Sequence, residues 1–144
     1  MKPILLVVAP YYQAITETLV SGATAAIYAA GFTAEMITVP GCFEIPGAIS
    51  MAATAERYSA YVALGCVIRG ETSHYDYVCG ESARGLQDLA VQKHLAIGYG
   101  ILTCETLEQA QLRADLAQGN KGGEAASAAL RMLELRRAFA LETT

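Results

Sequence analysis

The chain has 144 residues, of which 53% are hydrophobic and 17% are charged, and its formal net charge is −4. This composition excludes a disordered protein, and the sparse Lys and Arg residues form no basic stripe that would support nucleic-acid binding. No apolar run is long enough to cross a bilayer, and the length suits a single domain spanning residues 1–144.

The first half of the chain predicts two strands and two helices. Ile4–Ala9 is a continuous apolar run, which we interpret as a strand covered on both faces rather than as a secretory signal. Apolar residues at helical spacing predict a helix over Ile15–Ala30. Thr33–Val39 reads as a second strand, and Pro46 suits the first turn of a helix that runs to about Arg57.

The second half continues the alternation of strands and helices. Tyr61–Ile68 is a third buried strand, Tyr75–Lys93 is helical, and Ala96–Thr103 is a fourth strand. Regular alternation of this kind predicts a parallel sheet with helices on both faces.

Two further helices complete the predicted order. A capping-box pattern at Thr106 opens a helix that we expect to end near Gly119. The pair Gly122-Gly123 is expected to separate it from a last helix over Glu124–Ala140.

Unusual polar and aromatic residues follow every predicted strand. Parallel sheets bind ligands at the carboxyl ends of their strands, so these segments should converge on one rim. The segments are Pro10-Tyr11-Tyr12-Gln13, Pro40-Gly41-Cys42-Phe43-Glu44, Arg69–His74 and Thr103-Cys104-Glu105.

His74 is the best candidate for proton transfer on this rim. Ser73 is expected to cap the following helix, with Asp76 in its first turn, so the imidazole would lie near a positive helix end that disfavours its charged form. Backbone amides beside Gly70 and the hydroxyl of Thr72 could hold an oxyanion. A histidine at the surface or core edge, beside a plain turn, is the structural alternative.

The other rim residues each allow a structural and a functional interpretation. Tyr11 and Phe43 could stack on a flat ring or could simply complete the core. Glu44 suits either the next helix N-terminus or hydrogen bonds from a polyol. Arg113, within a helix, is by itself most typical of a solvated face.

Several chemistries lack their sequence patterns. There is no dinucleotide fingerprint, no phosphate loop, and no histidine at metal-ligand spacing, so we expect no metal. The four cysteines lie in apolar segments without a CxxC pair, which indicates buried free thiols in a reducing cytoplasm. Cys42 and Cys66, near strand ends, remain as weak nucleophile candidates.

Three motifs together resemble the lumazine synthase family. They are VPGCFEIP at Val39–Pro46, GCVIRGETSHYDYVC at Gly65–Cys79 and GNKGG at Gly119–Gly123, and the likeness extends from Ile4 to about Phe139. The resemblance implies an α/β fold, a flavodoxin-like three-layer sandwich with a four-stranded parallel sheet.

The resemblance also implies a reaction between two small-molecule substrates without any metal or organic cofactor. The family condenses 5-amino-6-(D-ribitylamino)uracil with 3,4-dihydroxy-2-butanone 4-phosphate to 6,7-dimethyl-8-ribityllumazine in riboflavin biosynthesis, with loss of phosphate and water. Every step is a proton transfer or a charge displacement, so positioning, one base and an anion site suffice.

The same resemblance implies a role for individual residues. His74 matches the proton-transfer histidine, and Tyr11 matches the aromatic that stacks on the pyrimidine. Further implied substrate-binding residues lie around the ring and ribityl chain (Cys42, Phe43, Glu44), along the backbone beside the uracil (Cys66, Val67, Ile68), at the phosphate turn (Glu71, Thr72) and on an adjacent subunit (Tyr99, Arg113).

The chain departs from many family members at a few positions. Tyr11 and Tyr99 stand where many have phenylalanine, and Ala117 stands where many carry a lysine near the phosphate. Many members also have a longer segment before the first strand, so we expect a homopentamer with active sites between subunits, while a larger assembly stays open. The functional alternatives are a non-catalytic flavin- or lumazine-binding relative and an interaction module whose rim residues are structural.

Overall fold

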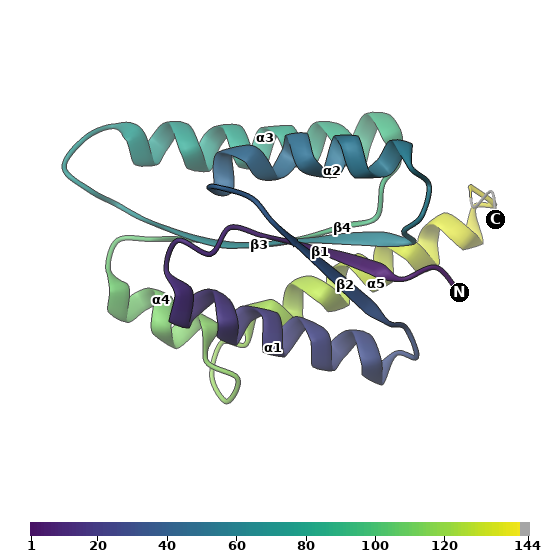
Figure 1. The fold of residues 1–144 in the computed structure, drawn as a ribbon, viewed down its shortest axis with the longest axis horizontal. Coiled ribbons are helices and arrows are strands. Elements are labelled where there is room, and N and C mark those ends of the chain that lie inside the picture. The colour runs from purple at the N-terminus through teal and green to yellow at the C-terminus, as the bar shows by residue number, and fades with distance from the viewer. Residues whose placement is uncertain (142–144) are drawn as a thin grey trace.

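A single four-stranded sheet organises the computed structural model, which describes residues 1–141 (Figure 1). All neighbouring strands are parallel, in the order β2-β1-β3-β4. Ile4 of the central strand β1 pairs with Ala34 on one side and with Ala60 on the other. The strands are β1 (Ile4–Val8), β2 (Ala34–Thr38), β3 (Ala60–Ile68) and β4 (Ile97–Cys104).

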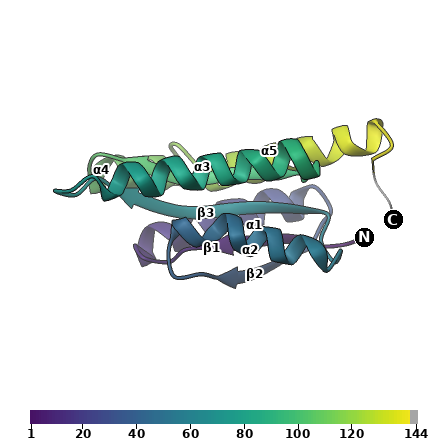
Figure 2. The ribbon, with the colours of Figure 1, turned by 90° about the horizontal axis from the view of Figure 1, so that it is seen from above.

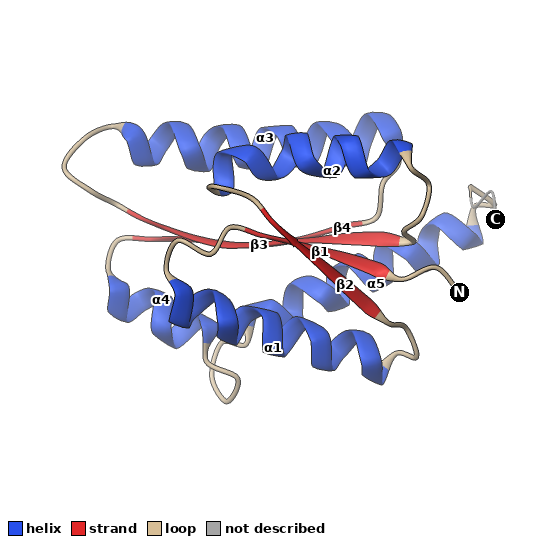
Figure 3. Cartoon of the chain, viewed as in Figure 1, coloured by secondary structure: helices blue, strands red, loops and turns tan. Residues whose placement is uncertain are grey.

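Helices cover both faces of this sheet (Figure 3). Helices α2 and α3 lie on one face, and α1, α4 and α5 lie on the other. This arrangement confirms the predicted α/β three-layer fold of the flavodoxin-like type. The helices are α1 (Gln13–Ala29), η1 (a short 3₁₀ turn, Cys42–Glu44), α2 (Ile45–Thr54), α3 (His74–Lys93), α4 (Leu107–Ala114) and α5 (Lys121–Ala138).

The core consists of two apolar layers separated by the sheet. Ile4, Leu6 and Val8 of β1 pack into the layer beneath α1 and α5, whereas Leu5 and Val7 pack into the layer beneath α2 and α3. Successive strand side chains point to opposite faces, so a strand buried on both must be apolar throughout. This explains the uninterrupted apolar run from which the sequence predicted β1.

Three predicted helix boundaries were wrong, and the first is the end of α2, which lies at Thr54 rather than near Arg57. Helix α4 ends at Ala114 rather than near Gly119, because the Asp115 backbone leaves the helical region and its side chain accepts from the Ala117 amide at 3.1 Å. Gly122 and Gly123, expected to separate two helices, lie inside α5. The start of α5 is fixed by Asn120, whose side chain accepts a hydrogen bond from the Gly123 amide at 3.3 Å.

The sheet directs the connections that follow its strands to one end of the molecule. The β3–α3 loop and the β4–α4 connection lie together at this end in Figure 1, whereas Met1 and the C-terminal part of α5 lie at the opposite end (Figure 2). In the described part of the chain, none of the helices has the length and apolarity that crossing a membrane requires.

Candidate active site

A cavity of about 970 Å³ opens at the carboxyl ends of β1 and β3. Its walls come from the segment after β1, from η1, from the end of β3 and from the first turns of α3. Three of the four segments predicted to converge on the rim therefore contribute to one cavity, whereas Thr103-Cys104-Glu105, at the end of β4, does not line it. A concave site of this size, at this end of a parallel sheet, is the expected location for a small-molecule ligand.

Most of the predicted site residues line this cavity. Those that do are Tyr11, Cys42, Phe43, Glu44, Cys66, Val67, Ile68, Thr72 and His74. The aromatic rings stand at its mouth, because Tyr11 is 78% exposed and Phe43 is 53% exposed. The apolar floor is formed by the end of β3, where Cys66 is buried and Val67 is half-buried.

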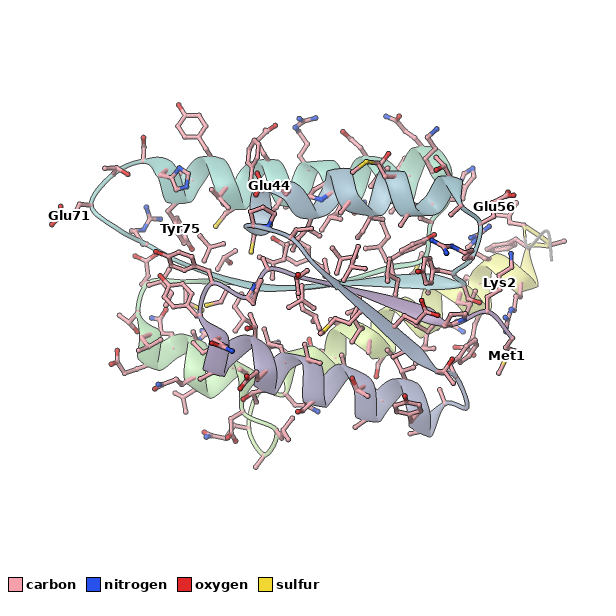
Figure 4. The ribbon with its side chains drawn as sticks, in the orientation of Figure 1. Met1, Lys2, Glu44, Glu56, Glu71 and Tyr75 are labelled. Atoms are coloured by element: carbon pink, nitrogen blue, oxygen red, sulfur yellow. The ribbon has the colours of Figure 1, made fainter. Side chains whose placement is uncertain are left out.

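Glu71, Tyr99 and Arg113 do not line the cavity within this chain. Glu71 lies at the tip of the β3–α3 loop and points outward (Figure 4). Tyr99 lies on the edge strand β4, where its hydroxyl is within hydrogen-bonding reach of Ser82. Arg113 is on α4, across the sheet from α3, and its guanidinium donates to the Gln109 carbonyl at 3.2 Å. The interpretation that Tyr99 and Arg113 serve a neighbouring subunit stays a prediction.

The cavity also contains aromatic residues that the sequence analysis did not assign to a site. Tyr12 is half-buried and meets Tyr11 edge to face, with ring centroids 4.9 Å apart and planes at 78°. Tyr75 and Tyr77 come from the first turns of α3. The edge-to-face contact limits the orientations available to the exposed Tyr11 ring.

Helical periodicity could have identified two other missed residues. Val78 and Glu81 lie four and seven positions after His74 on α3, so they share its face of the helix. The end of a strand predicts which residues reach the rim, but it carries no signal for residues further along the following helix.

The start of α3 sets the position of His74, but not through the predicted cap. Ser73 occupies the N-cap position, yet its side chain makes no capping hydrogen bond. The hydroxyl of Thr72 instead accepts from the His74 amide at 3.3 Å, and the Asp76 amide donates to the Ser73 carbonyl at 3.0 Å. The expectation that Asp76 lies in the first turn is confirmed. His74 itself is exposed at the cavity wall.

The two cavity thiols are poor nucleophiles. Burial raises the pKa of Cys42 and of Cys66 to about 12, since a thiolate loses its hydration in an apolar site. Both side chains therefore stay protonated near neutral pH, and only the thiolate attacks electrophiles. The weak nucleophile interpretation of these cysteines loses its chemical basis, and they act as small apolar residues of the floor.

We expect Cys42 and Cys66 of the folded protein to resist alkylation by iodoacetamide at about pH 8, because so little of each is thiolate. Peptide mass spectrometry after a timed reaction measures this directly, with denatured protein as the control in which all four cysteines react. Cys79, which is only half-buried, should be modified before either of them. Rapid labelling of Cys42 in the native protein would contradict the assigned protonation state.

The described residues contain no cluster of side chains that could bind a metal ion. No group of three or more His, Cys, Asp or Glu side chains within residues 1–141 is arranged to hold a metal ion. The chemistry available at the cavity comes from the imidazole of His74, the carboxylates of Glu44 and Glu81, the hydroxyl of Thr72 and the tyrosine rings.

Comparison with known proteins gives a consistent picture over nearly the whole chain. Residues 2–137 match the family model described as 6,7-dimethyl-8-ribityllumazine synthase. Curated proteins of that name are 56% identical in Methylorubrum populi (96% of this chain, 85% of the relative) and 54% identical in Novosphingobium aromaticivorans (94% and 97%). Another, from Bartonella henselae, is 49% identical over 94% of this chain and 89% of its own length.

Proposed function

Because the chain belongs to the 6,7-dimethyl-8-ribityllumazine synthase family, we propose that it is the transferase that forms this lumazine in riboflavin biosynthesis. The substrates are 5-amino-6-(D-ribitylamino)uracil and 3,4-dihydroxy-2-butanone 4-phosphate, and no cofactor takes part. One observation carries the proposal: a single cavity holds an aromatic wall, a hydroxyl-bearing turn and an imidazole side by side.

The walls of the cavity suit the pyrimidine substrate. Tyr11 and Phe43 present exposed rings that can stack on the flat uracil, and the end of β3 offers backbone groups to the ring edge. The Glu44 carboxylate can accept hydrogen bonds from the ribityl hydroxyls. The amine is thereby held in place before the second substrate arrives, which lowers the entropic cost of the bimolecular step.

The β3–α3 loop suits the phosphorylated ketone. The Thr72 hydroxyl and the amides of the Gly70–Ser73 turn can donate to a phosphate at the N-terminal end of α3. His74, which follows this turn directly, would then stand between the phosphate and the heterocycle. We propose that Glu71 contributes to this phosphate-binding turn through its backbone amide, since its side chain points outward.

Proton transfer by His74 accounts for the sequence of steps. The pyrimidine amine attacks the ketone carbonyl and water leaves, giving an imine. His74 removes the proton from the carbon next to the imine as the phosphate departs with the C–O bond electrons, and it returns a proton to the terminal carbon of the resulting enol, which becomes a methyl ketone. The second amine of the pyrimidine then attacks this ketone, and the ring closes with loss of a second water. Removal and return of the proton call for one group that alternates between base and acid, as general acid–base catalysis requires, and an imidazole can do both.

We propose that the site is completed by an adjacent copy of the chain, most simply in a pentamer. Exposed aromatic side chains at the cavity mouth, together with Tyr77 at 67% exposure, leave apolar surface for a partner to cover. A neighbouring Tyr99 and Arg113 could supply the second stacking surface and the phosphate-binding charge. Free thiols at all four cysteines support a cytoplasmic location.

The decisive experiment mixes both substrates with the purified protein and follows lumazine absorbance together with phosphate release. We expect equal amounts of lumazine and phosphate at each time point. Binding of the pyrimidine without turnover would contradict the proposal and would identify a ligand-binding relative. Light scattering that shows a lone subunit would contradict the shared site.

Replacing Arg113 by alanine should mainly weaken binding of the phosphorylated ketone, by about 1.5 kcal/mol or somewhat more, because a charge-assisted hydrogen bond is lost. The measurement is the KM for each substrate separately, with the pyrimidine KM expected to change little. Arg131 offers a matched control, since it is an exposed helix arginine whose ion pair among the described residues is with Glu134 at 3.8 Å. If Arg131→Ala raised the same KM as much, Arg113 would have no specific role at the phosphate.

A further inference from the structure

Arg69 follows β3 directly and contacts side chains from two other elements. Its Nε lies 3.0 Å from each carboxylate oxygen of Glu105, just after β4, and its Nη1 lies 3.4 Å from Asp76 in the first turn of α3. The Arg69 amide also donates to the Cys104 carbonyl at 3.0 Å. One side chain therefore connects the carboxyl ends of β3 and β4 with the beginning of the helix that carries the imidazole.

The Arg69 guanidinium also stacks on Tyr75, which lines the cavity and immediately follows His74. The guanidinium carbon lies 4.3 Å from the centroid of the tyrosine ring, within the range of a cation–π contact. Tyr75 is in turn within hydrogen-bonding reach of Thr103 on β4. Figure 4 shows Tyr75 between the sheet and the β3–α3 loop. Arg69 thus contacts both Asp76 in the first turn of α3 and the Tyr75 ring that follows His74.

These contacts hold the start of α3 in place relative to the ends of β3 and β4, but they add little to the stability of the fold. The side chains of Arg69, Glu105 and Asp76 are 41%, 56% and 60% exposed, and exposed ion pairs contribute little to the free energy of unfolding. Arg69 does not line the cavity, and it faces two carboxylates that offset its charge. It is therefore poorly placed to bind a substrate phosphate directly.

We propose that Arg69 is a positioning residue for His74: by holding Glu105, Asp76 and Tyr75 together, it sets the orientation of the imidazole toward the cavity. This inference rests on the proposed synthase function and adds a residue to it. Small misplacements of a catalytic group are costly, because the reacting atoms must meet within a narrow range of distance and angle.

Kinetics of Arg69 variants test the proposal. Arg69→Gln should lower kcat by roughly tenfold with both KM values nearly unchanged, since the acting group is misplaced while the binding surfaces remain. Arg69→Lys should recover part of the loss, because it keeps the charge but not the planar stack. In a His74→Ala background, Arg69→Gln should have no further effect on kcat. Arg131→Gln removes a comparable exposed arginine and should leave all parameters unchanged.

Two kinetic outcomes would overturn the proposal. If Arg69→Gln lowered kcat equally in the unaltered protein and in the His74→Ala variant, Arg69 would act by stabilising the structure and not by positioning His74. A raised KM for the phosphorylated ketone at constant kcat would show that Arg69 binds the phosphate itself.

A spectroscopic measurement keeps the inference separate from the proposed function. The chain has two histidines, so His94→Asn assigns their ring signals in an NMR spectrum, and asparagine tolerates the left-handed backbone at that position (φ 57°). Arg69→Gln should shift and broaden the His74 ring signals, whereas Arg131→Gln should not. Unchanged His74 signals in Arg69→Gln would refute the positioning role, whether or not the unaltered protein makes lumazine. Absence of synthase turnover in the unaltered protein would count against the proposed function alone.

Discussion

Replacing His74 by alanine is expected to slow lumazine formation by roughly 10²- to 10³-fold, within the usual range for loss of a general acid–base group. The pyrimidine should still bind with nearly the same affinity, because the aromatic wall and the floor of the cavity remain intact. Residual activity is expected, since an amine and a ketone form an imine slowly without help. Steady-state kcat and KM, together with calorimetric binding of the pyrimidine, separate these two effects.

His94 provides the matched control for this substitution. It follows the last residue of α3 as the C-cap, is exposed, and lies at the far end of the helix from the cavity, so His94→Asn should leave kcat unchanged. A His74→Ala protein with the rate of the unaltered chain would show that another group shuttles the proton. Glu44 and Glu81 would then be the remaining acid–base candidates of the cavity.

Gly122→Ala is expected to destabilise the fold by about 3 kcal/mol, the upper end for overpacking a core. A Cβ at position 122 would overlap the backbone of Leu19, including its carbonyl oxygen, because α5 packs against α1 with almost no space between the two helix backbones. Backbone cannot move aside as a side-chain tip can, so the two helices would have to separate. Urea denaturation measures the change in the free energy of unfolding.

Gly80→Ala is the comparison that isolates the effect of close packing. Gly80 is also inside a helix, but a Cβ there meets nothing within 4 Å, so alanine should stabilise the protein by about 0.5–1 kcal/mol through helix propensity. If Gly122→Ala and Gly80→Ala had the same stability, the contact between α1 and α5 would have to be looser than the structure indicates.

The strand positions and the layer order followed from sequence because they depend on local patterns. Ile4–Val8, Ala60–Ile68 and Ile97–Cys104 are apolar runs bounded by polar or turn residues, and each begins and ends within one residue of its prediction. Burial on both faces requires apolar side chains throughout β1 and most of β3, whereas β4, at the sheet edge, exposes Tyr99 and Thr103. The convergence of Tyr11, Phe43 and His74 on one cavity then follows from the parallel direction of the strands.

The features that sequence reasoning missed depend on contacts between distant segments. Gly122 and Gly123 weaken a helix by propensity, yet they lie inside α5. A Cβ at position 122 would overlap the Leu19 backbone, and a Cβ at position 123 would meet the Asn120 side chain that caps the helix. The hydrogen bond from the His74 amide to Thr72, in place of a Ser73 cap, is decided by loop geometry. Neither effect leaves a periodic signal in the sequence.

The central position of β1 has a consequence for synthesis of the chain. β1 leaves the ribosome first, but one of its two ladders requires β3, which begins at Ala60. Parallel pairing over such a separation closes slowly, because the chain entropy is lost before the contacts are gained. The nascent polypeptide therefore carries an apolar strand with one edge unpaired until β3, through Ile68, has also left the ribosome, and unpaired strand edges of this kind are prone to aggregation.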